Sequence, residues 1–435
     1  MNIPTPSGQT SLRALRALVR EHSVLAALEV FADELGSIFR FTMPGFNPVM
    51  LVGPEAARFV LVSDRQNLRW RNDSDPVTLL LRHGVLVEDG EPHDSLRRAM
   101  TPALHKQMLT HYAADMLRCT DSVTARWVPG SAPDMLVEMR RIALLILTDT
   151  LFKVDFSSDI GRMWNAVLKT LAYISPGMWI LWRNAPRPGY SKALQQMDDY
   201  LYQIIRHRKQ VLGSTDDLLG HLIDMGMDDD LIRDQLLTML IAGHDTSTAL
   251  LSWTLYLLGK HPDSLHQVQA ELDAVLGSQP PTAETVIELR YLEQVIEESL
   301  RLYPPIHLGS RVAAEDLDFQ GHTIPSGTRV MYSIYLTHRM KQHWDEPARF
   351  NPERFSAEGS RPRQPYTYLP FGGGPRNCIG AAFGRIEAKL VLARILQQFD
   401  LALLPKPVYA HMGATLEPRP GVWMQVMPRA SQQSP

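Results

Sequence analysis

The chain of 435 residues contains only two cysteines, Cys119 and Cys378. Two cysteines cannot form a disulfide framework, and their scarcity fits a reducing, cytosolic setting. The formal net charge of −3 argues against general nucleic-acid binding. No run of about eighteen apolar residues occurs, and the polar N-terminus lacks the apolar core of a signal peptide. We therefore expect a soluble, cytoplasmic protein without a transmembrane segment.

Linkers rich in glycine and serine, long charge runs and internal repeats are also missing, so nothing divides the chain into domains. Hydrophobic residues make up 45% of it, which is enough for a sizeable core. We predict a single domain over residues 1–435, with a partly ordered N-terminal segment over residues 1–22. Residues 1–10 and 430–435 are expected to be frayed.

Apolar residues recur at helical spacing in many segments, whereas alternating patterns are short. A hairpin is predicted over residues 38–52 around Gly45, and turns with strands over residues 321–328. Residues 69–90 are predicted to be irregular. The chain is therefore predicted to be mainly α with small β-sheets. Helices are expected over residues 23–35, from about 91, and over residues 135–152, 160–172, 192–211, 228–259 and 291–303.

The most unusual stretch is FGGGPRNCIG, from Phe371 to Gly380. Its glycines and proline exclude regular structure up to Arg376, while residues 379–399 have helical spacing. Cys378 is therefore predicted to lie at a loop-to-helix junction, where unpaired N–H groups would stabilise a thiolate. A buried, inert cysteine is one alternative. A phosphate-binding loop is another, but the Lys-Ser/Thr that should follow its glycines is missing.

This stretch resembles the haem-binding loop of the cytochrome P-450 family, Phe-x-x-Gly-x-Arg-x-Cys-x-Gly, at every fixed position. Five fixed positions match by chance in roughly one window in ten million. The resemblance covers the chain well from Asp89 onward and weakly before it. It implies a triangular, mainly helical domain that binds haem b (iron protoporphyrin IX). Cys378 would be the axial thiolate and metal ligand, with Phe371, Gly372 and Gly380 beside the cofactor.

The predicted long helix contains the stretch AGHDTST, which conflicts with helix formation. Gly243 costs about 1 kcal/mol relative to alanine there, and the hydroxyl residues compete for backbone carbonyls. Such conflicts tend to mark function, and they predict a kink or a widened turn able to hold water. The stretch resembles the family's oxygen-activation motif. By that resemblance Ala242 and Gly243 contact the haem, Thr246 anchors oxygen and water, and Asp245 supplies protons. His244 is expected to serve packing or an ion pair.

His93 and Arg97 are four residues apart on a predicted helix and share one face. Two donors on one face suit an anionic group, although in isolation a solvated basic helix is the better explanation of the segment. The order of the motifs resembles that of the cytochrome P-450 family. It implies that His93, Arg97, Arg311 and Arg376 bond the haem propionates.

Glu298 and Arg301 are three residues apart on the helix predicted over residues 291–303. An exposed pair of this kind contributes only a few tenths of a kcal/mol. Their neighbours are apolar, however, and a buried charge must be satisfied. Together with Arg354 in a Pro-Glu-Arg-Phe segment, the pair resembles the family's ionic network that braces the cysteine loop.

By resemblance the protein is a haem-dependent monooxygenase that inserts one atom of O2 into an apolar small molecule. Residues 306–309 and 411–415 are expected to edge the pocket, and the apolar residues 174–190 to roof it or contact membranes. No charged substrate anchor can be placed from the sequence. Fatty acids, terpenoids, steroids and macrolide-like molecules therefore stay open as substrates, with a lean toward the fatty-acid and terpenoid branches.

No flavin or iron–sulfur module fits within this length, so electrons should come from a separate ferredoxin- or flavodoxin-type partner. A basic patch on the thiolate side would suit such an acidic carrier. A haem-based ligand sensor and an oxygen-independent haem isomerase or dehydratase remain as alternatives, although neither needs the Asp245–Thr246 pair. The residues expected in the patch are Arg97, Arg98, Lys106, Arg376, Arg385 and Lys389.

Overall fold

The structure is a computed structural model that describes residues 2–43, 45–176, 187–211, 216–359 and 363–429. Most of these residues are helical, as predicted. The helices are α1 (Gly8–Glu21), α2 (Val24–Leu35), α3 (Pro54–Arg58), α4 (Pro76–Leu81), α5 (Gly90–Met100), α6 (Lys106–Thr124), α7 (Met135–Leu151), α8 (Ile160–Ile174), α9 (Ser191–Gln210), α10 (Leu218–Asp224), α11 (Asp229–Lys260), α12 (Pro262–Leu276), α13 (Arg290–Leu302), α14 (Ile334–Thr337) and α15 (Ala381–Gln398).

The strands form one five-stranded sheet, in the order β1-β2-β7-β4-β3, and three two-stranded sheets. The predicted hairpin is confirmed, because β1 and β2 pair antiparallel with Ile38 opposite Leu51. Strand β2 pairs parallel with β7, which belongs to the last third of the chain. The strands are β1 (Ile38–Arg40), β2 (Val49–Val52), β3 (Leu68–Arg69), β4 (Leu308–Ala313), β5 (Leu317–Phe319), β6 (His322–Ile324), β7 (Arg329–Ser333), β8 (Phe399–Leu403), β9 (Tyr409–Met412), β10 (Leu416–Arg419) and β11 (Met424–Pro428).

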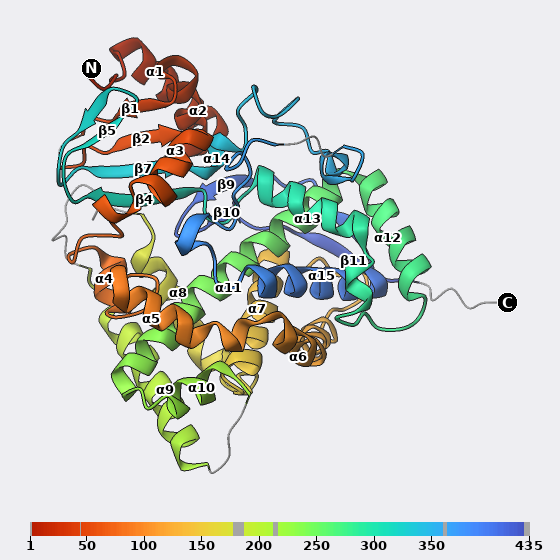
Figure 1. Cartoon of the computed structure of the whole chain (residues 1–435). Helices are drawn as coiled ribbons and strands as arrows, with labels where there is room; N and C mark the ends of the chain where they lie inside the picture. The colour runs from red at the N-terminus through yellow and green to blue at the C-terminus, as the bar shows by residue number, and fades with distance from the viewer. Residues whose placement is uncertain (1, 44, 177–186, 212–215, 360–362, 430–435) are drawn as a thin grey trace.

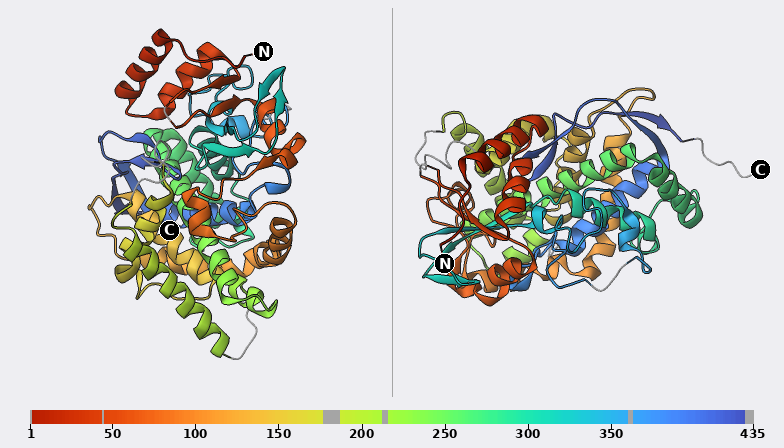
Figure 2. Two further views of the ribbon diagram at one scale, coloured as in Figure 1. Left: turned by 90° about the vertical axis from the view of Figure 1, so that its left-hand side faces the viewer. Right: turned by 90° about the horizontal axis from the view of Figure 1, so that it is seen from above.

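The outline of the molecule is triangular (Figure 1). Helices α1 and α2 and the five-stranded sheet lie at one end, and α9 and α10 lie at the other, as both Figure 1 and the left view of Figure 2 show. Helix α11 crosses the middle and packs on α7 and α15. The largest apolar core surrounds these three helices.

Helix α11 owes its limits to local signals at both ends. The side chain of Asp228 accepts a hydrogen bond from the N–H of Leu231 at 2.7 Å, which caps the first turn. Pro262 follows two residues after the last helical residue, where it prevents continuation. Because α11 is buried along most of its length, tertiary packing stabilises it more than intrinsic propensity does.

Several predictions about local structure are wrong in detail. Residues 8–10 are not frayed, because Ser7 caps α1 by accepting from the N–H of Thr10 at 3.1 Å. Residues 69–90 are not wholly irregular, since α4 begins with a proline at its first position. Helices α6, α10 and α12 were not predicted. The predicted roof lies largely outside the described residues, because residues 177–186 are not among them.

Candidate active site

The cysteine loop is shaped by its glycines and by one backbone bond. The N–H of Cys378 donates to the carbonyl of Phe371 at 2.8 Å. Gly372 and Gly374 have φ values of 71° and 64°, in the left-handed region that favours glycine. A Cβ on Gly374 would lie 2.4 Å from the carbonyl oxygen of Leu61. The loop therefore packs directly on the segment Phe59–Ser63, which follows α3. Helix α15 begins at Ala381, two residues later than predicted, and Cys378 lies at the predicted loop-to-helix junction.

The thiol of Cys378 is in a less favourable setting for ionisation than the sequence predicted. Burial raises its pKa above the usual 9.0, and the N–H of Gly380 and the charge of Arg97 only partly offset that effect. Helix-end donors do act in the predicted direction, but desolvation outweighs them. The positive charge of a bound metal would oppose this effect and favour the thiolate.

Cys378 opens into a cavity of about 540 Å³. The cysteine loop and α11 line it, together with β4, β7, the segment around α4 and the turn before β10. The predicted pocket edges are largely confirmed, because residues 306–309 and 412–415 belong to this lining. The predicted site residues on its wall are Thr246, Asp245, Cys378, His93, Arg97, Arg311, Arg376, Phe371, Gly372 and Ala242.

Two predicted cofactor-binding glycines do not line the cavity. A Cβ on Gly243 would lie 2.6 Å from the Cδ1 atom of Leu147 on α7, so this glycine faces the neighbouring helix and permits its close approach. A Cβ on Gly380 would lie 4.0 Å from the sulfur of Cys378. Gly380 thus flanks the thiol, and a direct contact of either glycine with a cofactor stays a prediction.

His93 and Arg97 share one face of α5, as predicted, and both reach the cavity. The Nδ1 atom of His93 lies 2.8 Å from Asp94 Oδ1. Burial nevertheless lowers the pKa of His93, so it is mainly neutral at neutral pH. The guanidinium of Arg97 donates to the carbonyl and the side-chain oxygen of Asn377, both at 2.7 Å. Arg97 thereby ties α5 to the residue before the cysteine.

Arg311 and Arg376 bring two more guanidinium groups to the cavity wall from other elements. Arg311 lies on β4, where it donates to the carbonyl of Ser310 at 2.7 Å. Arg376, in the cysteine loop, donates to Asp89 Oδ1 at 2.6 Å. Burial lowers the pKa of Arg376 to about 10, which leaves it charged at neutral pH. Three elements thus present basic groups to one cavity.

Helix α11 is α-helical without interruption, so the widened turn predicted around Gly243 is not present. The hydroxyl of Thr246 donates to the carbonyl of Ala242 at 2.7 Å, and Thr248 bonds His244 in the same way at 2.8 Å. Both hydroxyls thus bond carbonyls of their own helix, whose α-helical backbone is uninterrupted. His244 is fully buried, and its Nε2 lies 3.0 Å from the carbonyl of Arg140, which fits the packing role predicted for it.

Asp245 lies in a buried cluster of charges between α11, α7 and β10. Its Oδ2 accepts a hydrogen bond from Thr415 at 2.7 Å, and its Oδ1 has no hydrogen bond from any described residue. Arg140 lies 3.7 Å from Asp245 Oδ1 and also pairs with Glu417. Burial, with the negative charge of Glu417 and against that of Arg140, raises the pKa of Asp245 to about 6. Burial opposes ionisation of Glu417 too, but Arg140 and Arg419 lower its pKa.

Glu387 was not singled out in the sequence, yet it adjoins the same motif from the other side. It lies on α15, is 2% exposed, and accepts a hydrogen bond from the hydroxyl of Ser247 at 2.5 Å. Ser247 lines the cavity. Burial raises the pKa of Glu387 to about 8, so this carboxyl is mainly protonated at neutral pH. Glu387 thus contacts the residue that follows Thr246, and it is a second buried acid beside the site.

The three residues expected to form an ionic network do meet. Arg301 and Glu298 are fully buried and joined by two hydrogen bonds of 2.6 and 2.8 Å, and Arg354 Nε lies 3.3 Å from Glu298 Oε1. Arg301 also donates to the carbonyl of His338 at 3.0 Å. The Nε2 of His338 accepts from the N–H of Leu369 at 2.9 Å, two residues before the cysteine loop. The network therefore connects to that loop through His338.

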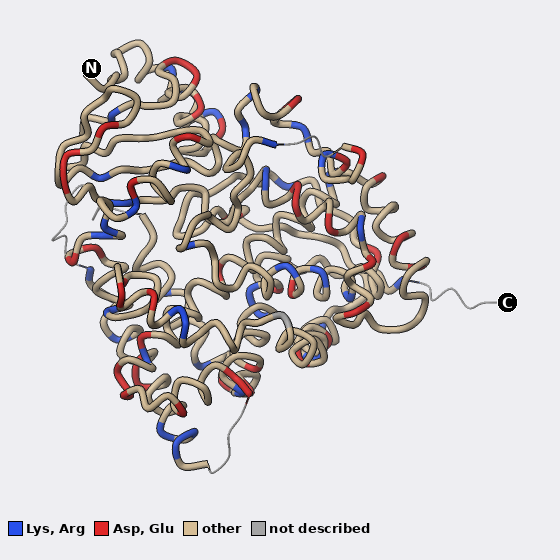
Figure 3. The backbone as a smooth tube through the Cα atoms, viewed as in Figure 1, with Lys and Arg blue, Asp and Glu red and all other residues tan. Residues whose placement is uncertain are grey.

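The expected basic patch is largely neutralised by neighbouring carboxylates. Arg376 pairs with Asp89, as described above, and the side chain of Lys106 lies outside what the structure describes. Over the described backbone, Figure 3 shows acidic and basic residues interspersed in this view. The other pairs are Arg98 with Glu91, Arg385 with Glu297 and Lys389 with Glu293.

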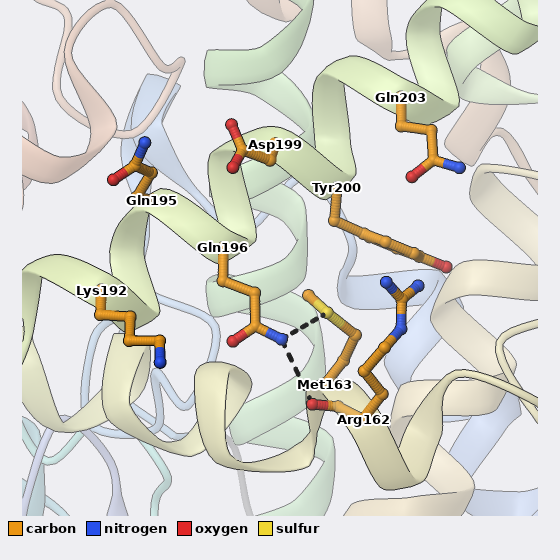
Figure 4. A pocket seen from close by; sticks show the side chains of 8 residues that line it. All are labelled: Arg162, Met163, Lys192, Gln195, Gln196, Asp199, Tyr200 and Gln203. Atoms are coloured by element: carbon orange, nitrogen blue, oxygen red, sulfur yellow. Dashed lines mark hydrogen bonds between the residues drawn. The ribbon is translucent and has the colours of Figure 1, made fainter.

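A second, smaller hollow of about 310 Å³ lies between α8 and α9 (Figure 4). Its lining comes from these two helices alone and is mainly polar. Gln196 spans it by donating to the carbonyl of Arg162 at 3.3 Å and to the sulfur of Met163 at 3.5 Å. None of the predicted site residues lines it, so the chemistry belongs to the cavity of Cys378.

Comparison with known proteins decides the family. The model of the cytochrome P450 family matches residues 9–423, including most of the first third, where the motifs were weak. The chain belongs to the cytochrome P450 family. As a cytochrome P450 it is a haem-dependent oxidoreductase, and its fold is the mainly α fold predicted from the sequence. None of the described helices is both long and apolar enough to cross a bilayer.

Named relatives of this cytochrome P450 come from several organisms. It is 32% identical to the putative cytochrome P450 120 of Synechocystis, over 86% of this chain and 85% of that protein. It is 30% identical to the cyclooctat-9-en-7-ol 5-monooxygenase of Streptomyces melanosporofaciens, over 81% and 80%. A solved structure of retinoic acid bound cyanobacterial CYP120A1 superimposes with a TM-score of 0.83 at 26% identity, covering 98% of this chain and 99% of that one.

Proposed function

We propose that this cytochrome P450 binds haem b through Cys378 and inserts one oxygen atom from O2 into an apolar small molecule. One observation carries the proposal. The sulfur of Cys378 opens into the same cavity that Asp245 and Thr246 line from α11. When bound, a thiolate-ligated haem supplies the oxygen activation. The residues of this chain supply binding, orientation, exclusion of water and protons.

The donor set around the cavity fits a haem. Cys378 brings the one thiol of the described lining, and basic side chains reach the same cavity from α5, β4 and the cysteine loop. These side chains are His93, Arg97, Arg311 and Arg376. Guanidinium groups suit carboxylates such as propionates because they present paired donors in a plane. Phe371, Gly372 and Ala242 add apolar or small surface to the same wall. The network of Glu298, Arg301 and Arg354 would hold the cysteine loop in place through His338.

Protons would reach the cavity from the acids beside Thr246. With a pKa of about 6, Asp245 can release and regain a proton near neutral pH, and the matching of pKa to pH favours transfer. Its Oδ1 is buried and has no hydrogen bond from the described residues, so it is free to bond a water admitted to the cavity. The Thr246 hydroxyl lines the cavity and would orient that water.

The substrate is expected to be lipophilic. Most of the residues lining the cavity are apolar, and relatives support molecules of terpenoid size. One is named for cyclooctat-9-en-7-ol, and one solved structure holds retinoic acid. Fatty acids, terpenoids and steroids are all of this class. Electrons would come from a separate ferredoxin- or flavodoxin-type protein, which would have to dock on a surface whose arginines and lysines are mostly paired.

The decisive experiment replaces Cys378 by serine in purified, haem-loaded protein. Wild type should show the red-shifted absorbance of a thiolate-ligated ferrous carbonyl complex, and Cys378→Ser should lose it. Cys119→Ser is the matched control, because Cys119 is buried away from the cavity lining and should leave the spectrum unchanged. A wild-type protein without haem, or a spectrum that survives Cys378→Ser, would refute the proposal. Consumption of NADPH and O2 with added carrier proteins separates a monooxygenase from a sensor or an isomerase.

A further inference from the structure

Five guanidinium groups line the cavity of Cys378, which is more than a haem requires. They belong to Arg71, Arg97, Arg311, Arg329 and Arg376. Two of them are matched by carboxylates of the chain, since Arg329 pairs with Asp75 and Arg376 with Asp89. The remaining carboxylate of the lining, Asp245, lies beside Arg140. A haem has two propionates, so binding it leaves one positive charge of the wall unmatched.

Among the described residues, Arg71 is the most weakly paired of these arginines, because its one carboxylate neighbour, Asp75, is shared with Arg329. Arg329 occupies both oxygens of Asp75 at 2.9 and 3.0 Å, and Arg71 remains 4.0 Å from that carboxylate. Its Nε atom is buried and donates no hydrogen bond to any described residue. The guanidinium stacks over the ring of Trp70 at 4.8 Å. This stacking fixes the plane of the guanidinium and leaves its donors for another acceptor.

The charge of Arg71 persists in this setting at an energetic cost. Burial and the nearby charges of Arg329 and Arg311 lower the pKa of Arg71 to about 10, which still leaves it protonated at neutral pH. Buried charges are normally paired. An anion that enters the cavity would therefore gain a charge-assisted hydrogen bond and relieve the repulsion among three arginines.

Beyond the charged residues next to Arg71, much of the cavity lining is apolar. Trp70, Val77 and Val85 come from the same segment, and Ile241 and Leu250 come from α11. A ligand that satisfies this wall needs one anionic end and a hydrocarbon body. We propose that Arg71 binds the carboxylate of a lipophilic acid, which makes such acids the preferred substrate class. This inference rests on the proposed monooxygenase function and narrows it.

The test compares decanoic acid with methyl decanoate, which share a chain but not a charge. Dissociation constants are measured by calorimetry on haem-loaded protein near pH 7.5. Wild type should bind the acid about 10- to 100-fold more tightly than the ester, as a charge-assisted hydrogen bond predicts. Arg71→Gln should abolish this preference with little change for the ester. Arg71→Lys should keep part of it, because it preserves the charge without the planar fork. The exposed Arg126→Gln is the control and should change neither constant.

Haem content and the carbonyl spectrum of each variant identify the reason for any failure. If Arg71→Gln loses haem while the ratio of acid to ester binding stays at the wild-type value, Arg71 binds a propionate and the proposal is wrong. Equal binding of acid and ester by a wild type with a normal thiolate spectrum also overturns it, and the proposed function then stands. An abnormal wild-type spectrum overturns the proposed function instead, whatever the acid preference.

Discussion

Replacing Glu387 by glutamine should flatten the dependence of stability on pH. The carboxyl ionises with an ordinary pKa of 4.5 when exposed, and burial raises the pKa to about 8 in the folded protein. Between these values the folded state keeps a proton that the unfolded state has released. The free energy of unfolding therefore falls as pH rises through this window, by up to about 1.4 kcal/mol per pH unit.

The size of this effect follows from the position of Glu387. At pH 7 the buried acid destabilises the fold on the order of 3 kcal/mol relative to a group that never ionises. Glutamine has no proton to lose, but its amide hydrogens lack partners beside Ser247, which costs about 1 to 3 kcal/mol at any pH. Glu387→Gln should thus be less stable than wild type at pH 5 and close to it or more stable at pH 8.

The assay is urea unfolding at pH 5, 6, 7 and 8, with the slope of unfolding free energy against pH as the readout. Glu358→Gln is the matched control, because Glu358 is exposed and should not alter the slope. Other titrating groups contribute equally to wild type and variant, so only the difference in slopes matters. Parallel curves for wild type and Glu387→Gln would show that Glu387 is ionised in the folded protein, and the reasoning would be refuted.

The other predictions concern the buried ion pair of Glu298, a glycine of the cysteine loop and the supply of protons by Asp245. Glu298→Gln should destabilise the fold by about 3 to 5 kcal/mol in urea unfolding, because it leaves a buried arginine without a counter-charge. Glu346→Gln, in an exposed pair, should change stability by less than about 1 kcal/mol; equal losses would contradict a buried network. Gly374→Ala should reduce haem retention and stability, since its φ is positive and its Cβ meets a carbonyl. Gly161→Ala, which meets nothing, should not. Asp245→Asn should slow oxygen-dependent turnover and remove a rate transition near pH 6; an unchanged pH profile would exclude Asp245 as the proton donor.

Elements with strong local signals could be predicted from the sequence. The long helix was predicted over residues 228–259 and is observed at Asp229–Lys260, because Asp228 and Pro262 mark its ends independently of packing. The hairpin of β1 and β2 follows from alternation around a glycine turn. Short α4 was missed because its sequence, PVTLLL, has no helical period to detect in six residues. The prediction of a widened turn is wrong, because the Thr246 hydroxyl bonds the carbonyl of Ala242 while the backbone of α11 stays α-helical.

The site could be predicted only where its residues belong to motifs. Cys378, Asp245 and Thr246 were found because their neighbours in sequence are unusual. Arg140 and Glu387 were not, because their partners lie 277 and 140 residues away and only the fold makes them buried. Arg71 was missed because nothing in its local sequence is unusual. Its weak pairing becomes apparent only in the fold, where Arg329 hydrogen-bonds both carboxylate oxygens of Asp75.

Three consecutive residues of α11 explain why the helix tolerates so polar a stretch. Successive residues of an α-helix point about 100° apart, so Asp245, Thr246 and Ser247 face different neighbours. Asp245 turns to the charges of α7 and β10, Thr246 to the helix backbone and the cavity, and Ser247 to Glu387 on α15. At pH 7 an acid with a pKa near 6 is mostly ionised, and one with a pKa near 8 is mostly protonated. The two buried acids therefore differ in charge on either side of the same hydroxyl, and of the two only Asp245 lines the cavity.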